Sequence, residues 1–258
     1  MTATREVLTP RTIAGLIPEP VGEIEHTSRI NALIYGEPGD GKTHLSGSAD
    51  EVPEWRKVLH LDVEGGSMTL RRKFPRVETV RVTSWSKLWD IGHDLFMNDC
   101  YDFGTVIIDN LTEAQNLCKR KVMEDAKERA KDPDDIELEV PRQRDWGVLA
   151  ERTMLLVRNY RDLPVNFIAT AHVMEVSDNR GKKKLKPALQ GSAKHNLPAA
   201  FDLVFYLRKA KIDGQDEEVR LLSTSGTSEY IAKERDTNIP KQLGNPTMAE
   251  ILSYIPKG

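Results

Sequence analysis

The sequence has little cysteine, no long apolar run and little net charge. Its two cysteines, Cys100 and Cys118, are too few for a disulfide framework or a cysteine metal cluster. The longest apolar stretches, at residues 105–108 and 165–171, are far too short to cross a membrane, and the first twenty residues lack the apolar run of a signal peptide. These absences predict a cytoplasmic protein with no membrane partner.

The net charge is −3, from 37 basic and 40 acidic residues among 258. A chain that is basic throughout is therefore excluded, and any contact with nucleic acid has to be local. Hydrophobic residues make up 39% of the chain and charged residues 30%, which indicates a globular protein with a sizeable core and argues against wholesale disorder.

Two parts of the chain differ in pattern. Residues 1–28 are polar and contain prolines without clear periodicity, which predicts an N-terminal arm, whereas residues 29–258 alternate apolar runs with helical patterns, which predicts one α/β domain. We expect strands at 31–35, 57–63, 78–82, 105–108 and 165–171, helices at 84–96, 111–130 and 145–162, and hairpin strands within 173–189, 201–207, 218–223 and 229–233. The predicted fold is a mainly parallel sheet flanked by helices and extended by C-terminal antiparallel strands. Trp89 and Phe96 belong to the predicted apolar face of the 84–96 helix.

Residues 36–43 fit the G-x-x-x-x-G-K-[ST] pattern of a phosphate-binding loop in full. The glycines let successive backbone N–H groups turn toward phosphate oxygens, and a helix that begins near Lys42 directs its positive end at the same anion. A chance match to a glycine-rich turn is the alternative, but a strand precedes the motif and a helix follows it. The residues expected to contact a nucleotide are Gly36, Glu37, Pro38, Gly39, Asp40, Gly41, Lys42, Thr43 and His44.

The loop predicts ATP and Mg²⁺ as cofactors. Lys42 would reach the β- and γ-phosphates, and the Thr43 hydroxyl would bind Mg²⁺. A second metal-organising acid is expected at the end of a neighbouring strand, where Asp109 follows the apolar run 105–108. Asp109 could also cap the next helix. Hydrolysis needs a group that orients or deprotonates water, and the residues leave Glu64 and Glu113 open for that role.

Four segments in order, the phosphate loop and residues 61–64, 106–110 and 167–172, resemble the RecA-like ATPases over about residues 29–240. The chain looks most like the short phage-encoded members with an AAA-type loop, including the Sak-type single-strand annealing ATPases. The resemblance implies that Glu64 takes the place of the catalytic glutamate. It also implies that His172 stands where RecA-like proteins carry a glutamine that senses the γ-phosphate, although a polar residue can simply close a strand.

The same resemblance implies assembly into a homo-oligomer. The pair Lys233 and Arg235, one residue apart, is similar to the pair through which RecA-like subunits reach a neighbour's nucleotide, the alternative being two ordinary solvated cations. Such a contact is head-to-tail and needs a ring or a filament, between which the sequence does not choose. Residues 1–28 would then dock one protomer onto the next.

Basic residues gather in one hairpin. Residues 175–195 carry a net charge of +4, which leaves −7 for the rest of the chain. RecA-like proteins place a DNA-binding loop directly after the sensor strand, where this hairpin falls, although a charged hairpin tip can also be merely solvated. The segment has no aromatic residue, so neither base stacking nor sequence readout is expected. The residues predicted to contact DNA phosphates are Arg180, Lys182, Lys183, Lys184, Lys186 and Lys194.

Together these features predict a DNA-recombination ATPase that assembles on single-stranded DNA and hydrolyses ATP at subunit interfaces. Annealing fits the chain length better than autonomous strand exchange, and a single-strand binding protein is a candidate partner. The sequence does not separate DNA from RNA. The alternative is a nucleotide-controlled assembly module that binds a protein partner with little turnover.

Overall fold

A computed structural model describes residues 29–132, 137–138, 140–177, 181–211, 218–235 and 237–256, which fall within one compact unit. The arm predicted at residues 1–28 lies outside the described residues, and so does Arg180 of the basic hairpin.

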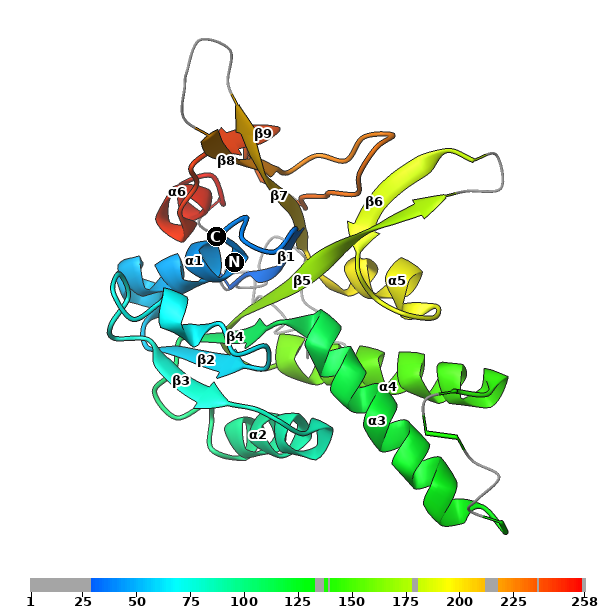
Figure 1. The fold of residues 1–258 in the computed structure, drawn as a ribbon. Coiled ribbons are helices and arrows are strands. Elements are labelled where there is room, and N and C mark those ends of the chain that lie inside the picture. Colours follow the sequence, from blue (N-terminus) through cyan, green and yellow to red (C-terminus); the bar gives the residue numbers. More distant parts are fainter. Residues whose placement is uncertain are drawn as a thin grey trace, which may run out of the picture. The chain divides into compact units, whose positions relative to one another are not determined.

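The described residues form a mixed α/β domain (Figure 1). Its elements are β1 (Asn31–Gly36), α1 (Lys42–Gly47), η2 (Ser48–Glu51), η3 (Pro53–Trp55), β2 (Val58–Asp62), η4 (Ser67–Thr69), β3 (Glu78–Arg81), α2 (Trp85–Met97), β4 (Thr105–Asp109), α3 (Leu111–Arg129), α4 (Gln143–Arg161), β5 (Asn166–Ser177), β6 (Lys183–Pro187), α5 (Ala193–Asn196), η6 (Leu197–Ala200), β7 (Leu203–Lys211), β8 (Glu218–Ser223), β9 (Gln242–Gly244) and α6 (Met248–Ser253).

The strands form one mainly parallel sheet in the order β3-β2-β4-β5-β1-β7-β8-β9, and β6 pairs with β5. The six strands from β3 to β7 are parallel to their neighbours, whereas β8, β9 and β6 run antiparallel to theirs. This confirms the predicted fold, including its C-terminal antiparallel extension. Because the parallel strands all end at one edge of the sheet, the loops that follow β1, β2 and β4 meet there.

Helices cover both faces of the sheet because its central strands are apolar on both sides. Leu33 and Tyr35 of β1 pack into a core shared with α2, α3 and α4. Ala32 and Ile34, which point the other way, pack into a second core with α1 and α6. Figure 1 shows the first group of helices together below the sheet and the second beside β1. None of the helices in the described part of the chain has both the length and the apolar character of a membrane span.

Three local predictions were wrong. β5 does not end at residue 171 but continues to Ser177, because its second half pairs with β6 beyond the edge of the parallel sheet. Residues 229–233 form no strand, since they cross from β6 to β7 and make only single bridges, Leu185 to Tyr230 and Val204 to Lys233. On α2, the residues Trp89 and Phe96 are 38% and 68% exposed, and they lie outside the stripe that faces the core.

Candidate nucleotide-binding site

The predicted phosphate loop follows β1, the strand between β5 and β7. Gly36 has no room for a side chain, because a Cβ there would lie 2.2 Å from the carbonyl oxygen of Leu207 on β7. Gly39 and Gly41 have φ values of 85° and 96°, in the left-handed region that favours glycine. Gly41 is the N-cap of α1, which begins at Lys42 as predicted.

Lys42 lies inside this loop and is buried. Its Nζ donates hydrogen bonds to the carbonyl oxygens of Gly36 (3.0 Å) and Glu37 (2.9 Å). Burial lowers the pKa of the Lys42 ammonium, although the carboxylates of Glu64 and Asp109 nearby oppose the shift. The cation therefore stands where it can neutralise a phosphate held by the loop.

Asp109, the last residue of β4, lies directly beside the loop and is buried. Its carboxylate accepts hydrogen bonds from the hydroxyls of Thr43 (2.6 Å) and Thr170, and Nε2 of His60 lies 3.3 Å away. Burial alone would raise the pKa of Asp109, but the interactions with His60, Thr170 and Thr43 outweigh it and hold that pKa below its usual range. The adjoining Thr43 hydroxyl and Asp109 carboxylate are hard oxygen donors of the kind that Mg²⁺ binds together with phosphate oxygens.

The loop that carries Glu64 is shaped by Asp62, a residue that sequence reasoning did not single out. The Asp62 carboxylate accepts hydrogen bonds from three successive backbone N–H groups, those of Gly65 (2.6 Å), Gly66 (3.1 Å) and Ser67 (3.2 Å). These bonds outweigh the effect of burial and lower the pKa of Asp62. The backbone N–H of Glu64 donates to the carbonyl of Asp109 (3.2 Å), which ties this loop to β4.

Glu64 and His172, predicted from distant parts of the sequence, come together around Asn110. The Asn110 amide donates to the Glu64 carboxylate and lies 3.2 Å from Nε2 of His172. The same His172 nitrogen is 3.4 Å from the other carboxylate oxygen of Glu64. Asn110 also caps α3, by accepting from the backbone N–H of Glu113 (2.9 Å). Asp109 is thus not the cap of that helix, and an asparagine directly before a helix was the sequence signal for Asn110.

Glu113, the other candidate for the catalytic base, makes a hydrogen bond within its own helix. Its carboxylate accepts a hydrogen bond from the Asn116 amide (3.1 Å). Glu64, by contrast, contacts Asn110 and His172 and acts electrostatically on Lys42. The geometry therefore favours Glu64.

The basic hairpin is formed by β5 and β6, which pair from Val173 with Pro187 to Ser177 with Lys183. Lys183, Lys184 and Lys186 lie on β6, and Lys182 directly precedes it. Lys183 forms an ion pair with Glu175 (2.7 Å), and Nζ of Lys186 lies 3.4 Å from Nδ1 of His195. Lys194 belongs to α5 rather than to the hairpin.

Lys233 and Arg235 lie far from the chain's own phosphate loop. Lys233 donates to the carbonyl of Ala199 (3.3 Å), and Arg235 forms an ion pair with Asp202 (2.8 Å). The side-chain amide of Asn31, the first residue of β1, donates a hydrogen bond to the Asp202 carboxylate. The pair thus lies at the edge where the parallel strands begin, opposite the edge that carries the loop.

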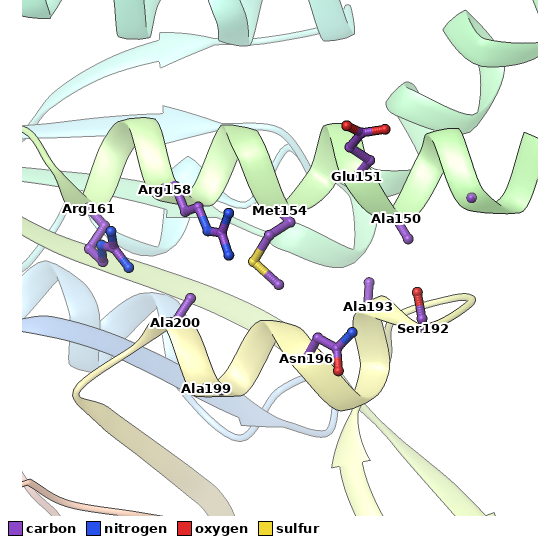
Figure 2. A pocket seen from close by; sticks show the side chains of 11 residues that line it. Ala150, Glu151, Met154, Arg158, Arg161, Ser192, Ala193, Asn196, Ala199 and Ala200 are labelled. Atoms are coloured by element: carbon purple, nitrogen blue, oxygen red, sulfur yellow. The ribbon is translucent and has the colours of Figure 1, made fainter.

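A cavity of about 530 Å³ lies between α4 and the α5–η6 segment, which includes Ala199, the hydrogen-bond partner of Lys233 (Figure 2). Arg158, Arg161 and Met154 of α4 point toward Asn196 and Ala200 across it. None of the predicted site residues lines this cavity.

The parallel sheet, the complete phosphate loop and the buried acid at the end of β4 define a RecA-like P-loop ATPase domain. Within that class, the chain belongs to the AAA_24 family of AAA domains, whose family model matches residues 28–235. None of the curated proteins matches the sequence.

Solved structures are similar at low identity. The RadB recombinase is 13% identical with a TM-score of 0.48 over 83% of this chain and 84% of its own. A KaiC-like protein of Pyrococcus horikoshii OT3 is 13% identical with a TM-score of 0.40 over 84% and 89%. The flagellar accessory protein FlaH of Methanocaldococcus jannaschii is 10% identical with a TM-score of 0.43 over 84% and 85%.

Proposed function

We propose that the protein is an ATP- and Mg²⁺-dependent DNA-recombination ATPase, of the annealing type, that assembles on single-stranded DNA. The observation that carries the ATPase part of this proposal is the convergence of Lys42, Thr43, Asp109, Glu64 and His172 at one edge of the sheet. A phosphate loop alone can bind a nucleotide. A carboxylate that two polar side chains hold beside the loop, as Asn110 and His172 hold that of Glu64, can in addition activate water for hydrolysis.

In the proposed reaction, Glu64 orients a water molecule and accepts its proton as the water oxygen bonds to the γ-phosphorus. The bond between that phosphorus and the β–γ bridging oxygen breaks, and ADP and phosphate leave. Lys42 neutralises charge on the transferred group. Thr43 and Asp109 would hold Mg²⁺, which would supply positive charge beside the phosphates. Asn110 and His172 fix the direction of the Glu64 carboxylate, and His172 would respond to the γ-phosphate.

The position of Lys233 and Arg235 supports the proposed subunit assembly. Because they lie at the edge opposite the chain's own loop, their proposed target is the nucleotide of a neighbouring protomer. A head-to-tail contact of this kind builds a ring or a filament. Residues 1–28 would join neighbouring protomers, and a single-strand binding protein is a further proposed partner.

One strand links the nucleotide to the proposed DNA contact. β5 carries His172 beside Glu64 and continues directly into the basic hairpin. The base of the hairpin is tied to the same residue, because Ala188 donates its backbone N–H to the carbonyl of His172 (2.7 Å). A shift of His172 on nucleotide binding or hydrolysis would thus reach the hairpin without an intervening element, and linkage then requires DNA to affect the nucleotide site as well.

Neutralising Lys182, Lys183 and Lys184 together with glutamine is expected to weaken binding of single-stranded DNA about tenfold at moderate salt. The slope of log affinity against log salt should become shallower by about 2, because each lost phosphate contact on a single strand removes about 0.7. Fluorescence anisotropy with a labelled oligonucleotide at several salt concentrations measures both, and ATP binding should be unchanged.

The matched control replaces Lys87, Lys211 and Lys241, which are exposed and lie outside the basic hairpin, with glutamine. It removes the same total charge. If both triple variants lose the same affinity, binding depends on overall charge, and the hairpin is not the DNA contact.

A further inference from the structure

The hairpin of β7 and β8 extends beyond the phosphate loop. β7 pairs with β1 only as far as Tyr206, whereas its last residues, through Lys211, pair with β8 alone. Side chains of a strand alternate between the two faces of a sheet, so Arg220 on β8 shares a face with Leu222. Leu222 belongs to the core that contains Leu45 of α1. Arg220 therefore stands on the side of the sheet where α1 begins.

The Arg220 side chain lies directly against the last glycine of the phosphate loop. A Cβ atom built on Gly41 would be 2.5 Å from Nε of Arg220, 2.9 Å from its Cδ and 3.1 Å from its Cζ. Only a glycine leaves space for this approach, independently of the left-handed backbone at that position. The guanidinium thus packs on the loop immediately before Lys42 and the first turn of α1.

Arg220 has a fixed backbone, and its charge is not neutralised by an acidic side chain of the described residues. Its N–H donates to the side-chain carbonyl of Asn245 (3.0 Å), and its carbonyl accepts from the N–H of Asn245 (2.6 Å). Among the described residues, no carboxylate forms an ion pair with its guanidinium. A half-buried arginine that lies against an anion-binding loop, with no acidic partner in the described part of the chain, is suited to bind an anion itself.

The charges around the start of α1 also favour an anion at this end of the loop. Burial lowers the pKa of His44, in the first turn of α1, and the positive charges of Lys73 and Arg220 lower it further. Two cations thus act on this end of the loop, whereas Glu64 and His172 stand at the other end with the groups proposed for the γ-phosphate.

We infer that Arg220 binds the α- and β-phosphates of a nucleoside di- or triphosphate, as a contact from the same chain. The inference rests on the proposed function and adds a phosphate-binding residue on β8, about 180 positions from the loop in sequence. The planar guanidinium can donate two parallel hydrogen bonds to phosphate oxygens, which an ammonium cannot do.

The test is titration calorimetry with ATP, ADP and inorganic tripolyphosphate, each with Mg²⁺. Arg220→Ala should weaken all three about tenfold, because each ligand presents at least two phosphates to the loop. Arg220→Lys should fall between this variant and the wild type. The matched control, Lys211→Ala, removes one exposed cation from the same hairpin and should stay within about twofold of the wild type.

Three results of this titration would contradict the inference or the function on which it rests. If Arg220→Ala binds all three ligands within about twofold of the wild type, the inference is wrong. If ATP and ADP weaken while tripolyphosphate does not, Arg220 contacts the nucleoside, and the assignment to phosphate is wrong. A wild type that binds neither nucleotide would instead contradict the proposed function itself. Thermal unfolding verifies that each variant is folded, and Arg220→Gln, which keeps the three methylene-position carbons and removes the charge, replaces the alanine variant if that one is not.

Discussion

Replacing Glu64 with glutamine is expected to lower the rate of ATP hydrolysis about 10²- to 10⁴-fold while ATP affinity stays near that of the wild type. Glutamine keeps the size of the side chain and can still accept the hydrogen bond from Asn110, but it cannot take a proton from water. The loss therefore falls on the chemical step. Steady-state phosphate release and equilibrium ATP binding, measured on the same preparation, separate the two effects.

Two control variants sharpen this prediction. Glu113→Gln should keep most of the activity, because the Glu113 carboxylate bonds to Asn116 of its own helix. Lys42→Ala should lose ATP binding together with hydrolysis, since it removes the cation inside the loop. If Glu64→Gln stays active and Glu113→Gln is inactive, the prediction is wrong and Glu113 is the catalytic base.

The second large effect is expected for Arg235→Ala, which should lower hydrolysis about 10³- to 10⁵-fold, as loss of an arginine finger does, without loss of ATP binding. The physical reason is its location: Arg235 lies beside Asp202 and Asn31, at the edge opposite its own phosphate loop, so its effect on chemistry has to be exerted on a neighbour. Phosphate release measures the loss.

Mixing two inactive variants tests the neighbour's role directly. In assemblies of Arg235→Ala with Glu64→Gln protomers, some interfaces combine an intact Glu64 with an intact Arg235 from the next protomer, so part of the activity should return. Asp202→Asn is the structural control, because it removes the ion pair of Arg235 and should leave hydrolysis largely intact. Wild-type turnover by Arg235→Ala alone would exclude the finger.

The parts of the fold that the sequence predicts well are those whose cause is local. The phosphate loop needs glycines at fixed positions and a lysine inside one turn, and β4 is an apolar run that ends at an acid, so both could be located from residue spacing. The residues that surround Asp109 could not be identified from residue spacing. Thr170 and His60 reach it because β5 and β2 flank β4 in the sheet, and nothing in their own segments shows that order.

The errors have a similar origin. Apolar content alone does not show that β5 continues past His172, because its second half is held by β6 and not by the core. Residues 229–233 look like a strand in sequence, yet they divide their backbone bonds between β6 and β7. Arg220 carries no local signal at all, since its contact with Gly41 depends on how far the β7–β8 hairpin extends.

The measurement that tests the account most directly is the rate of ATP hydrolysis by the full chain with and without single-stranded DNA. We predict Mg²⁺-dependent turnover that rises several-fold with DNA, because β5 connects His172 to the basic hairpin and linkage makes the two sites affect each other. Turnover that is absent, or identical with and without DNA, would contradict the account and favour a nucleotide-controlled assembly module with a protein partner.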